Sequence, residues 1–163
     1  MNAPLPAQLK FDLQGLVQAI ALAPAEDGLV IPLQPAQWEV LAPYLQPVAL
    51  AAGQTLFSHG DNDRSLYFVE TGSLSVHYED SKGRVRLGIC GAGTVVGEGS
   101  FFSHLPRSAT VQAGTPCKLW GLMSIRFTEL SNRRPEIALA IAMAAGGVAA
   151  KRLANRRRRV VST

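Results

Sequence analysis

The spacing of hydrophobic and polar residues along the chain changes twice, from helical to strand-like and back to helical. Over residues 9–22 apolar residues recur at helical spacing, which predicts an amphipathic helix that ends at Pro24 and the Asp27-Gly28 turn. A second, shorter helix is predicted over residues 34–46, where Pro35 suits the entry and apolar residues share one side. Residues 1–47 are therefore expected to form a helical lead-in.

Residues 48–122 follow the pattern of a β-domain. Short apolar or alternating runs are separated by turn residues, as in a sandwich or barrel, and residues 80–83 predict a hairpin tip. Eight strands of this length suit a jelly roll, which stacks two sheets. The predicted strands are 48–50, 55–57, 65–70, 73–78, 85–90, 94–96, 109–113 and 117–121.

The helical pattern returns over residues 123–163. A short helix is predicted from Ser124, as its cap, to Leu130, and residues 132–134 are expected to break it. Pro135 then suits the first turn of a long helix that runs to about residue 158.

Two adjacent glycines, Gly146-Gly147, interrupt the apolar part of this long helix. They weaken it by roughly 1 kcal/mol each relative to alanine and leave a smooth patch where another element could approach closely. The predicted fold is mainly β with flanking helices: an eight-stranded double-sheet jelly-roll barrel with N-terminal helices and a long C-terminal helix.

Composition agrees with one packed domain. The 163 residues are 47% hydrophobic and 17% charged, enough apolar material for a single core. The net charge of +4 is concentrated, because residues 151–159 hold six basic side chains and no acidic one. Residues 1–150 carry ten Lys and Arg against twelve Asp and Glu. The basic run is either a solvated helix end or an electrostatic contact for an acidic partner, nucleic acid or anionic lipid.

The cysteines and the apolar segments favour a cytoplasmic protein. Cys90 and Cys117 are too few for a disulfide scaffold and are interpreted as buried thiols. The first residues show no secretory signal pattern, and the most apolar stretch, residues 137–150, is shorter than the roughly 20 residues of a membrane helix. No transmembrane segment is expected.

Sequence motifs of catalysis and metal binding are not found. His59, His77 and His104 are scattered, whereas metal ligands cluster. Residues 97–100 do not form a nucleophile elbow, and residues 91–93 lack the lysine of a phosphate-binding P-loop. The protein is expected to be neither an enzyme nor a holder of a metal or cofactor.

One segment, residues 96–113, combines groups that suit a phosphate and a hydroxyl. Its glycines let the main chain approach an anion, and Arg107 offers a planar donor fork that matches phosphate oxygens. Glu98, when ionised, can only accept and so favours a hydroxyl donor. From the residues alone, a structural ion pair between Glu98 and Arg107 competes with this interpretation, since such pairs are common in proteins.

The same segment, called the cassette below, resembles the phosphate-binding cassette of cyclic-nucleotide-binding domains. That family includes the catabolite activators, the regulatory subunits of cAMP-dependent protein kinase and the cyclic-nucleotide-gated channels. The resemblance rests on Gly97-Glu98, on Pro106-Arg107-Ser108-Ala109-Thr110-Val111 and on an upstream pattern from Ala52-Gly53 to Gly72. It covers about residues 48–159.

The resemblance implies a role for individual residues. Glu98 would accept from the ribose 2′-hydroxyl, Arg107 would pair with the cyclic phosphate, and Ser108 would add a hydroxyl or N–H. Backbone amides of Gly97, Gly99 and Ser100 would bind the same phosphate. Val76 and Leu87 would lie against the base, and the long final helix would cover it.

The resemblance also implies a function. The expected protein is a cyclic-nucleotide-binding signal-transduction module, with cAMP as ligand and cGMP possible, that repositions its C-terminal helix. Its protein partner is expected to bind through that helix, the basic tail or the N-terminal helices. Two alternatives remain open: a receptor for cyclic di-GMP on the same fold, and a nucleotide-independent adaptor. The family's transcription factors continue into a helix-turn-helix after this helix. The chain ends at Thr163, so sequence-specific DNA binding is not expected.

Overall fold

Two stacked antiparallel sheets form the centre of the molecule. The computed structural model describes residues 12–24 and 26–161, with side chains up to residue 156. One sheet has the strand order β1-β8-β3-β6 and the other β2-β7-β4-β5. Every pair of neighbouring strands is antiparallel. The predicted mainly β jelly roll with flanking helices is confirmed.

The eight strands coincide closely with the predicted runs. Turn glycines at the predicted breaks have positive φ, a backbone conformation that glycine adopts without steric cost. The strands are β1 (Gln46–Leu50), β2 (Thr55–Phe57), β3 (Leu66–Thr71), β4 (Leu74–Glu79), β5 (Val85–Cys90), β6 (Val95–Val96), β7 (Thr110–Ala113) and β8 (Cys117–Leu122).

The helices depart from the predicted bounds at their ends. The elements are α1 (Gln14–Leu22), α2 (Pro35–Leu41), the 3-10 turn η1 (Ala42–Tyr44), α3 (Glu98–Ser103), α4 (Ser124–Arg133) and α5 (Pro135–Val161). The predicted second helix ends early because η1 closes it and β1 already begins at Gln46. The N-terminal residues of the predicted first helix, 9–11, lie outside the described residues.

Two predictions about α4 were wrong. Met123 is the N-cap and Ser124 is the first helical residue, without a side-chain cap hydrogen bond. The helix also continues through residues 132 and 133 of the expected break and ends at Arg133, so that only Arg134 of that break is non-helical; as the C-cap, Arg134 donates its N–H to the carbonyl of Leu130. Pro135 then opens α5, as predicted, because it needs no N–H donor there.

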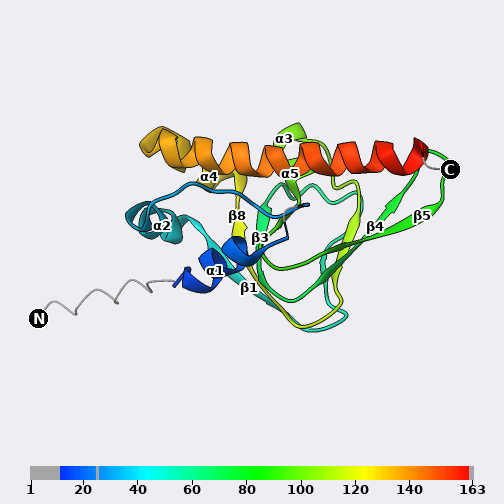
Figure 1. The fold of residues 1–163 in the computed structure, drawn as a ribbon, viewed down its shortest axis with the longest axis horizontal. Coiled ribbons are helices and arrows are strands. Elements are labelled where there is room, and N and C mark those ends of the chain that lie inside the picture. The colour runs from blue at the N-terminus through cyan, green and yellow to red at the C-terminus, as the bar shows by residue number, and fades with distance from the viewer. Residues whose placement is uncertain (1–11, 25, 162–163) are drawn as a thin grey trace, which may run out of the picture.

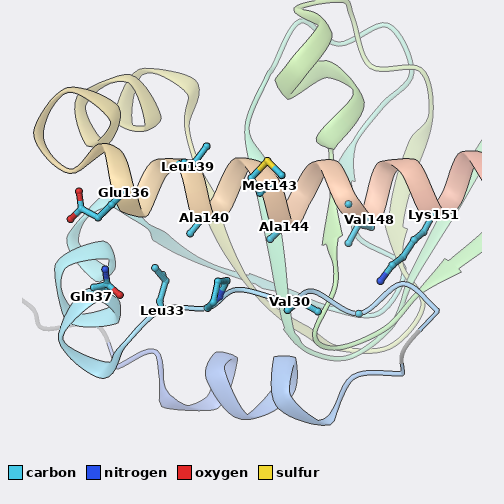
Figure 2. A pocket seen from close by; sticks show the side chains of 13 residues that line it. Val30, Leu33, Gln37, Glu136, Leu139, Ala140, Met143, Ala144, Val148 and Lys151 are labelled. Atoms are coloured by element: carbon cyan, nitrogen blue, oxygen red, sulfur yellow. The ribbon is translucent and has the colours of Figure 1, made fainter.

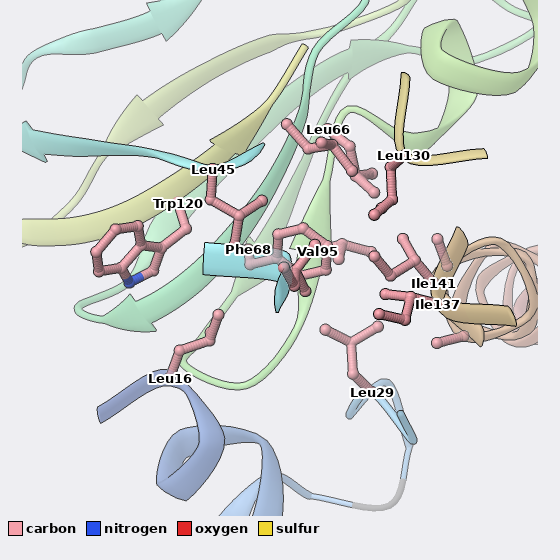
Figure 3. Close-up of a cluster of buried hydrophobic side chains, with 14 of the residues drawn as sticks. Leu16, Leu29, Leu45, Leu66, Phe68, Val95, Trp120, Leu130, Ile137 and Ile141 are labelled. Atoms are coloured by element: carbon pink, nitrogen blue, oxygen red, sulfur yellow. The ribbon is translucent and has the colours of Figure 1, made fainter. Parts of the chain in front are cut away.

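Apolar side chains fill two separate layers. One lies between the two sheets and includes Val69, Leu74 and Leu119. The other lies between the first sheet and the helices, where Phe68, Val95 and Trp120 meet side chains of α1, α4 and α5 (Figure 3). Alternate residues of β3 therefore serve both layers, which fixes the helices against this sheet.

Helix α5 runs along the whole length of the molecule above the sheets (Figure 1). Ile137 and Ile141 are fully buried and fix its first half. Among the described residues, Pro135–Arg156 is a segment long and apolar enough to cross a membrane, with a mean hydropathy of 1.5 and one third of its window buried. Such a segment is weak evidence for a membrane span, since core helices share these properties.

Candidate nucleotide-binding site

A cavity of about 430 Å³ opens between the cassette, the second sheet and the C-terminal half of α5. Cavities of this size are typical of small-molecule sites. Seven of the eight predicted site residues line it: Val76, Gly97, Glu98, Gly99, Ser100, Arg107 and Ser108. The rest of the lining comes from Glu26, Asp27, Phe57, Tyr78, Gly88, Ile89, Cys90, Val96, Ala109, Val111, Arg152, Asn155 and Arg156.

Arg107 is held almost completely out of solvent, with its side chain 1% exposed. Its Nη2 donates to the carboxylate of Asp63 over 2.6 Å and to the carbonyl of Ser65 over 2.7 Å, and its Nη1 donates to the carbonyl of Gly97 over 3.0 Å. The guanidinium also lies 4.0 Å from the ring centre of Phe57. These contacts fix the cation against the cavity wall before any ligand arrives.

The remaining donors of Arg107 are not all used. A guanidinium has five N–H donors, and the Nε of Arg107 is buried without a hydrogen-bond partner among the described residues. A buried unsatisfied donor costs about 1–3 kcal/mol.

The sequence around Gly97 allows this close arrangement. Gly97 has φ +86° and caps α3, a conformation that side-chain-bearing residues rarely adopt. A Cβ there would lie 2.5 Å from Nη1 of Arg107 and 2.7 Å from the carbonyl oxygen of Ser65. A Cβ added at Gly99 would meet no atom within 4 Å, so steric crowding does not require a glycine at that position.

Glu98 is bound to the C-terminal helix. Arg152 of α5 donates from Nη1 to Oε1 of Glu98 over 2.9 Å and from Nη2 to the hydroxyl of Thr94 over 3.0 Å. Its Nη2 also lies 3.4 Å from Asp27 and from the sulfur of Cys90. Arg152 therefore joins α5 to the cassette and to the segment after α1.

The expected structural competitor, a Glu98–Arg107 ion pair, is not what forms. Among the described residues Glu98 pairs with Arg152 and Arg107 pairs with Asp63. Glu98 and Arg107 thus line the same cavity while each is held by a different partner. The cavity wall therefore carries one negative group and one positive group.

Burial and charge shift the pKa values of groups around the cavity. Burial alone would raise the pKa of Asp63, but hydrogen bonds from Arg107 and Ser65 outweigh it and hold that pKa below its ordinary value. Burial opposes the charge on Arg152, yet Glu98, Cys90 and Asp27 raise its pKa. Burial raises the pKa of the Cys90 thiol. At neutral pH Arg152 is therefore a cation and Cys90 a neutral thiol.

The wall opposite the cassette comes from β4 and β5. Val76 pairs with Gly88 across the two strands, and both line the cavity. Arg156 of α5 stacks 4.5 Å above the ring centre of Tyr78 at the same wall. An apolar, partly aromatic surface is thus available beside the charged cassette.

Leu87 lies outside this lining, contrary to the expectation. It pairs with His77, one position from the Val76–Gly88 pair, and is 59% exposed. Successive residues of a strand point to opposite faces, so an error of one position moves a side chain to the other side of the sheet. The β5 position beside Val76 is Gly88, which presents backbone instead of a leucine.

Sequence reasoning missed several groups at the site. Asp63, Asp27, Tyr78 and Arg152 were not among the expected site residues. Asp63 closely follows the Gly60-Asp61 turn of the upstream pattern, which was the one local signal for it. The others come from segments whose approach to the cassette depends on the fold.

Known proteins with similar sequence and structure can now be compared with this geometry. The family model "Cyclic nucleotide-binding domain" matches residues 47–134, more than half of the chain. A cAMP-dependent protein kinase regulatory subunit of Yarrowia lipolytica is 33% identical over 86 residues, which are 53% of this chain and 22% of that protein. The cAMP-activated global transcriptional regulator CRP of Haemophilus influenzae is 31% identical over 113 residues, 68% of this chain and 49% of that protein.

The chain thus spans half or less of the length of these two relatives. Among solved structures, a cyclic nucleotide-binding domain from Methylobacillus flagellatus superposes with a TM-score of 0.79 at 18% identity, over 92% of this chain and 83% of that one, which shows a shared fold. The family match covers both sheets and the whole cassette. The chain belongs to the cyclic nucleotide-binding domain family.

Proposed function

We propose that this protein is a sensor for a cyclic mononucleotide, with cAMP as its ligand and cGMP as the nearest competitor. The observation that carries the proposal is the placement of the buried Arg107 cation and the Glu98 carboxylate on one cavity wall, at the cassette. A cyclic nucleotide presents a singly charged phosphate fused to a ribose with one free hydroxyl, and these two groups need a cation and an acceptor.

The phosphate is assigned to Arg107 and Ser108. The buried Nε of Arg107, without a partner among the described residues, supports this assignment, because a phosphate oxygen could accept from it. Backbone amides of Gly97, Gly99 and Ser100 are proposed to complete the anion site. Asp63 positions the guanidinium from behind and keeps its charge balanced when the cavity is empty.

The ribose is assigned to Glu98. Arg152 donates to Oε1 of Glu98, so the 2′-hydroxyl is assigned to the other oxygen of the same carboxylate. A carboxylate has about four acceptor positions and can hold both partners at once. Arg152 would then orient the carboxylate, and ligand and helix would meet at one residue.

The base is assigned to the wall of Val76, Gly88 and Tyr78. A planar purine can lie on Val76 and the glycine backbone, where no side chain blocks the approach. The Arg156–Tyr78 stack at the rim offers a further flat surface. Leu87 has no place in this assignment because it is 59% exposed and lies outside the cavity lining.

The output is assigned to α5. Arg152 and Arg156 both reach the cavity from this helix, so its position depends on what the cavity holds. A ligand changes that position only to the extent that it binds one arrangement better than the other. We propose that the moved helix, with its basic end, is presented to a protein partner and that the chain has no catalytic role.

The experiment is a calorimetric titration of the full chain with cAMP, cGMP, cyclic di-GMP and 5′-AMP. Binding of cAMP or cGMP with a preference over 5′-AMP supports the proposal. A preference for cyclic di-GMP would instead assign the larger messenger, and no binding of any of the four would favour a nucleotide-independent adaptor. Either of these results overturns the proposed ligand.

A further inference from the structure

The edge strand β5 carries three exposed apolar side chains in a row. Val85, Leu87 and Ile89 are 70%, 59% and 70% exposed, and alternate residues of a strand point to the same face of its sheet. None of the three belongs to either buried cluster. Single exposed apolar residues are normal on a protein surface, but a continuous row of them along an edge strand marks a surface for another chain.

Helices cover only one of the two sheets. Phe68 and Trp120 of the first sheet are buried beneath helices, and Figure 2 shows α5 beside the segment that carries Val30 and Leu33 on that side. The other buried cluster contains strand residues alone and lies between the sheets. Among the described residues, no buried apolar side chain of a helix therefore packs on the outer face of the second sheet, where Leu87 lies.

The backbone of β5 is also open on one side. β5 pairs with β4 and, among the described residues, with no other strand. At the hairpin the N–H of Asp80 donates to the carbonyl of Arg84 over 2.9 Å. Hydrogen-bonded and non-hydrogen-bonded pairs alternate along an antiparallel ladder, so the pairs at Val85, Leu87 and Ile89 are of the second kind. The N–H and C=O groups of these three residues therefore point away from β4, toward the open edge.

The same three residues thus offer side chains and backbone groups to one partner. An extended chain that adds to a sheet edge gains affinity from main-chain hydrogen bonds and specificity from its alternate side chains. Many edge strands carry a lysine or a proline that prevents such pairing, whereas positions 85, 87 and 89 carry neither. The edge of β5 is therefore suited to strand addition.

Positive charge gathers at the hairpin end of β5. Lys82 is exposed in the turn, and the side chains of Arg84 and Arg86 are 58% and 49% exposed. Both arginines donate to the same oxygen of Asp80, so one carboxylate is shared by two cations. With Glu79 included, residues 79–86 hold three cations and two carboxylates.

The end of α5 adds to this charge. Arg156 stacks 4.5 Å from the ring centre of Tyr78, and Tyr78 pairs with Arg86 across β4 and β5. Residues 157–159 continue the basic run in the sequence. The end of α5 thus lies beside the hairpin of β4 and β5 (Figure 1). A partner segment that carries acidic residues matches this charge.

We infer that an acidic, extended segment of the partner protein adds to the free edge of β5 as a further strand. Its alternate apolar side chains contact Val85, Leu87 and Ile89, and its acidic residues lie near Lys82 and the end of α5. Gly88 and Ile89 also line the nucleotide cavity, so the added strand lies next to the wall that faces the ligand. The inference rests on the proposed function for the role of this partner, but the contact itself requires no nucleotide.

The first experiment identifies the partner chemistry without assuming a sequence. Random peptides long enough to cover β5 are displayed on phage and selected on the full chain in the absence of nucleotide. Enriched peptides are expected to carry aliphatic residues at alternate positions and Asp or Glu beside them. A parallel selection on Leu87→Lys should not enrich these peptides, because strand addition would bury the new charge.

The affinity of an enriched peptide is then measured by fluorescence anisotropy. Leu87→Lys should weaken binding roughly tenfold or more. It should keep the melting temperature of wild type, because Leu87 is exposed in the free chain. Lys82→Gln should weaken binding about two- to fivefold and reduce its salt dependence. Ile125→Lys, at an exposed residue of α4, and Lys151→Gln, at the groove of Figure 2, are the matched controls and should bind as wild type does.

The second experiment tests the backbone pairing. Amide exchange is followed by NMR with and without the enriched peptide. The N–H groups of Val85, Leu87 and Ile89 should exchange much more slowly when the peptide is bound. Those of Arg86 and Gly88 should change little, because they already donate to β4. A peptide held by side-chain contacts alone would not produce this alternation.

Four outcomes overturn the inference. They are a selection that enriches no peptide, enriched peptides that bind Leu87→Lys as tightly as wild type, a complex without the alternating protection over residues 85–89, and self-association of wild type that Leu87→Lys abolishes. The last of these would assign the edge to a second copy of the chain. If cAMP fails to bind while the peptide docks on β5, the proposed ligand is wrong and the contact stands.

Discussion

The guanidinium of Arg152 holds the carboxylate of Glu98 at 2.9 Å, across 54 residues of sequence. One partner lies in the final helix and the other in the loop helix of the cassette. The side chains of both are mostly buried, at 20% and 17% exposed. Any ligand that changes the position of Glu98 therefore acts on α5 through a charged, shielded contact.

Removal of Arg152 should loosen the end of α5. Arg152→Ala leaves Glu98 and Asp27 without their shared cation, and we expect a loss of about 1–2 kcal/mol of unfolding free energy. Amide exchange after residue 148 should become faster. Lys151→Ala is the control, because Lys151 is exposed on the same turn. Equal exchange rates in both variants would show that the ion pair does not hold the helix.

Substitution of Arg107 should act on ligand affinity. Arg107→Lys keeps a charge but loses the fork that contacts Asp63, Ser65 and Gly97. Affinity for the cyclic nucleotide should fall by about 2–4 kcal/mol in calorimetry. Arg84→Lys, at an arginine outside the cavity lining, should bind as wild type does. A tight-binding Arg107→Lys protein that is folded by circular dichroism contradicts the phosphate assignment.

The sugar contact can be tested with ligands alone. If Glu98 accepts from the ribose 2′-hydroxyl, 2′-deoxy-cAMP should bind roughly tenfold or more weakly than cAMP, a difference of about 1.4 kcal/mol. Glu98→Gln should narrow that difference, because a neutral amide oxygen accepts more weakly. If wild type binds cAMP and 2′-deoxy-cAMP equally well, Glu98 does not accept from the 2′-hydroxyl and only holds Arg152.

The Asp63–Arg107 pair should make stability depend on pH. Because the folded-state pKa of Asp63 lies below its ordinary value, the carboxylate stabilises the fold above about pH 4 and loses this effect as pH falls through the folded-state pKa. The melting temperature of Asp63→Asn should therefore lie below that of wild type at neutral pH and approach it in acid. The exposed Glu39→Gln serves as the reference. If the difference in melting temperature between Asp63→Asn and wild type stays constant from neutral pH into acid, the Asp63–Arg107 pair is not its cause.

Ligand should slow amide exchange in two separate segments. One is the cassette from residue 97 to 109 and the other is α5 from residue 136 to 153. Alanine and glycine dominate the middle of α5, so each residue buries little area and the docking energy is modest. A base over Val76 would add apolar surface for the helix to cover. Protection confined to the cassette at saturating ligand would mean that α5 does not carry the signal.

The strands and the cassette could be predicted because their signals are local. Turn residues and alternating apolar runs marked all eight strands to within one or two positions, since a half-buried strand needs that alternation wherever it lies. Gly97 and Arg107 stand within one short segment whose spacing is itself the motif. Pro135 and the apolar stretch that follows it also located α5. These features depend on neighbours in sequence, so the strands and α5 could be predicted from the chain itself, whereas the roles of the cassette residues also needed the resemblance to a known family.

The tertiary structure alone decided the partners of the charged groups. Asp63 reaches Arg107 across 44 residues and Arg152 reaches Glu98 across 54, because strand order and the path of α5 bring these segments together. The position of Leu87 also depended on tertiary structure, in this case on the pairing of two strands. Its neighbour Gly88 faces the cavity instead, since pairing of β4 with β5 sets which alternate residues point inward. A local pattern fixes the type of each element, whereas the direction and partner of a side chain follow from contacts between distant elements.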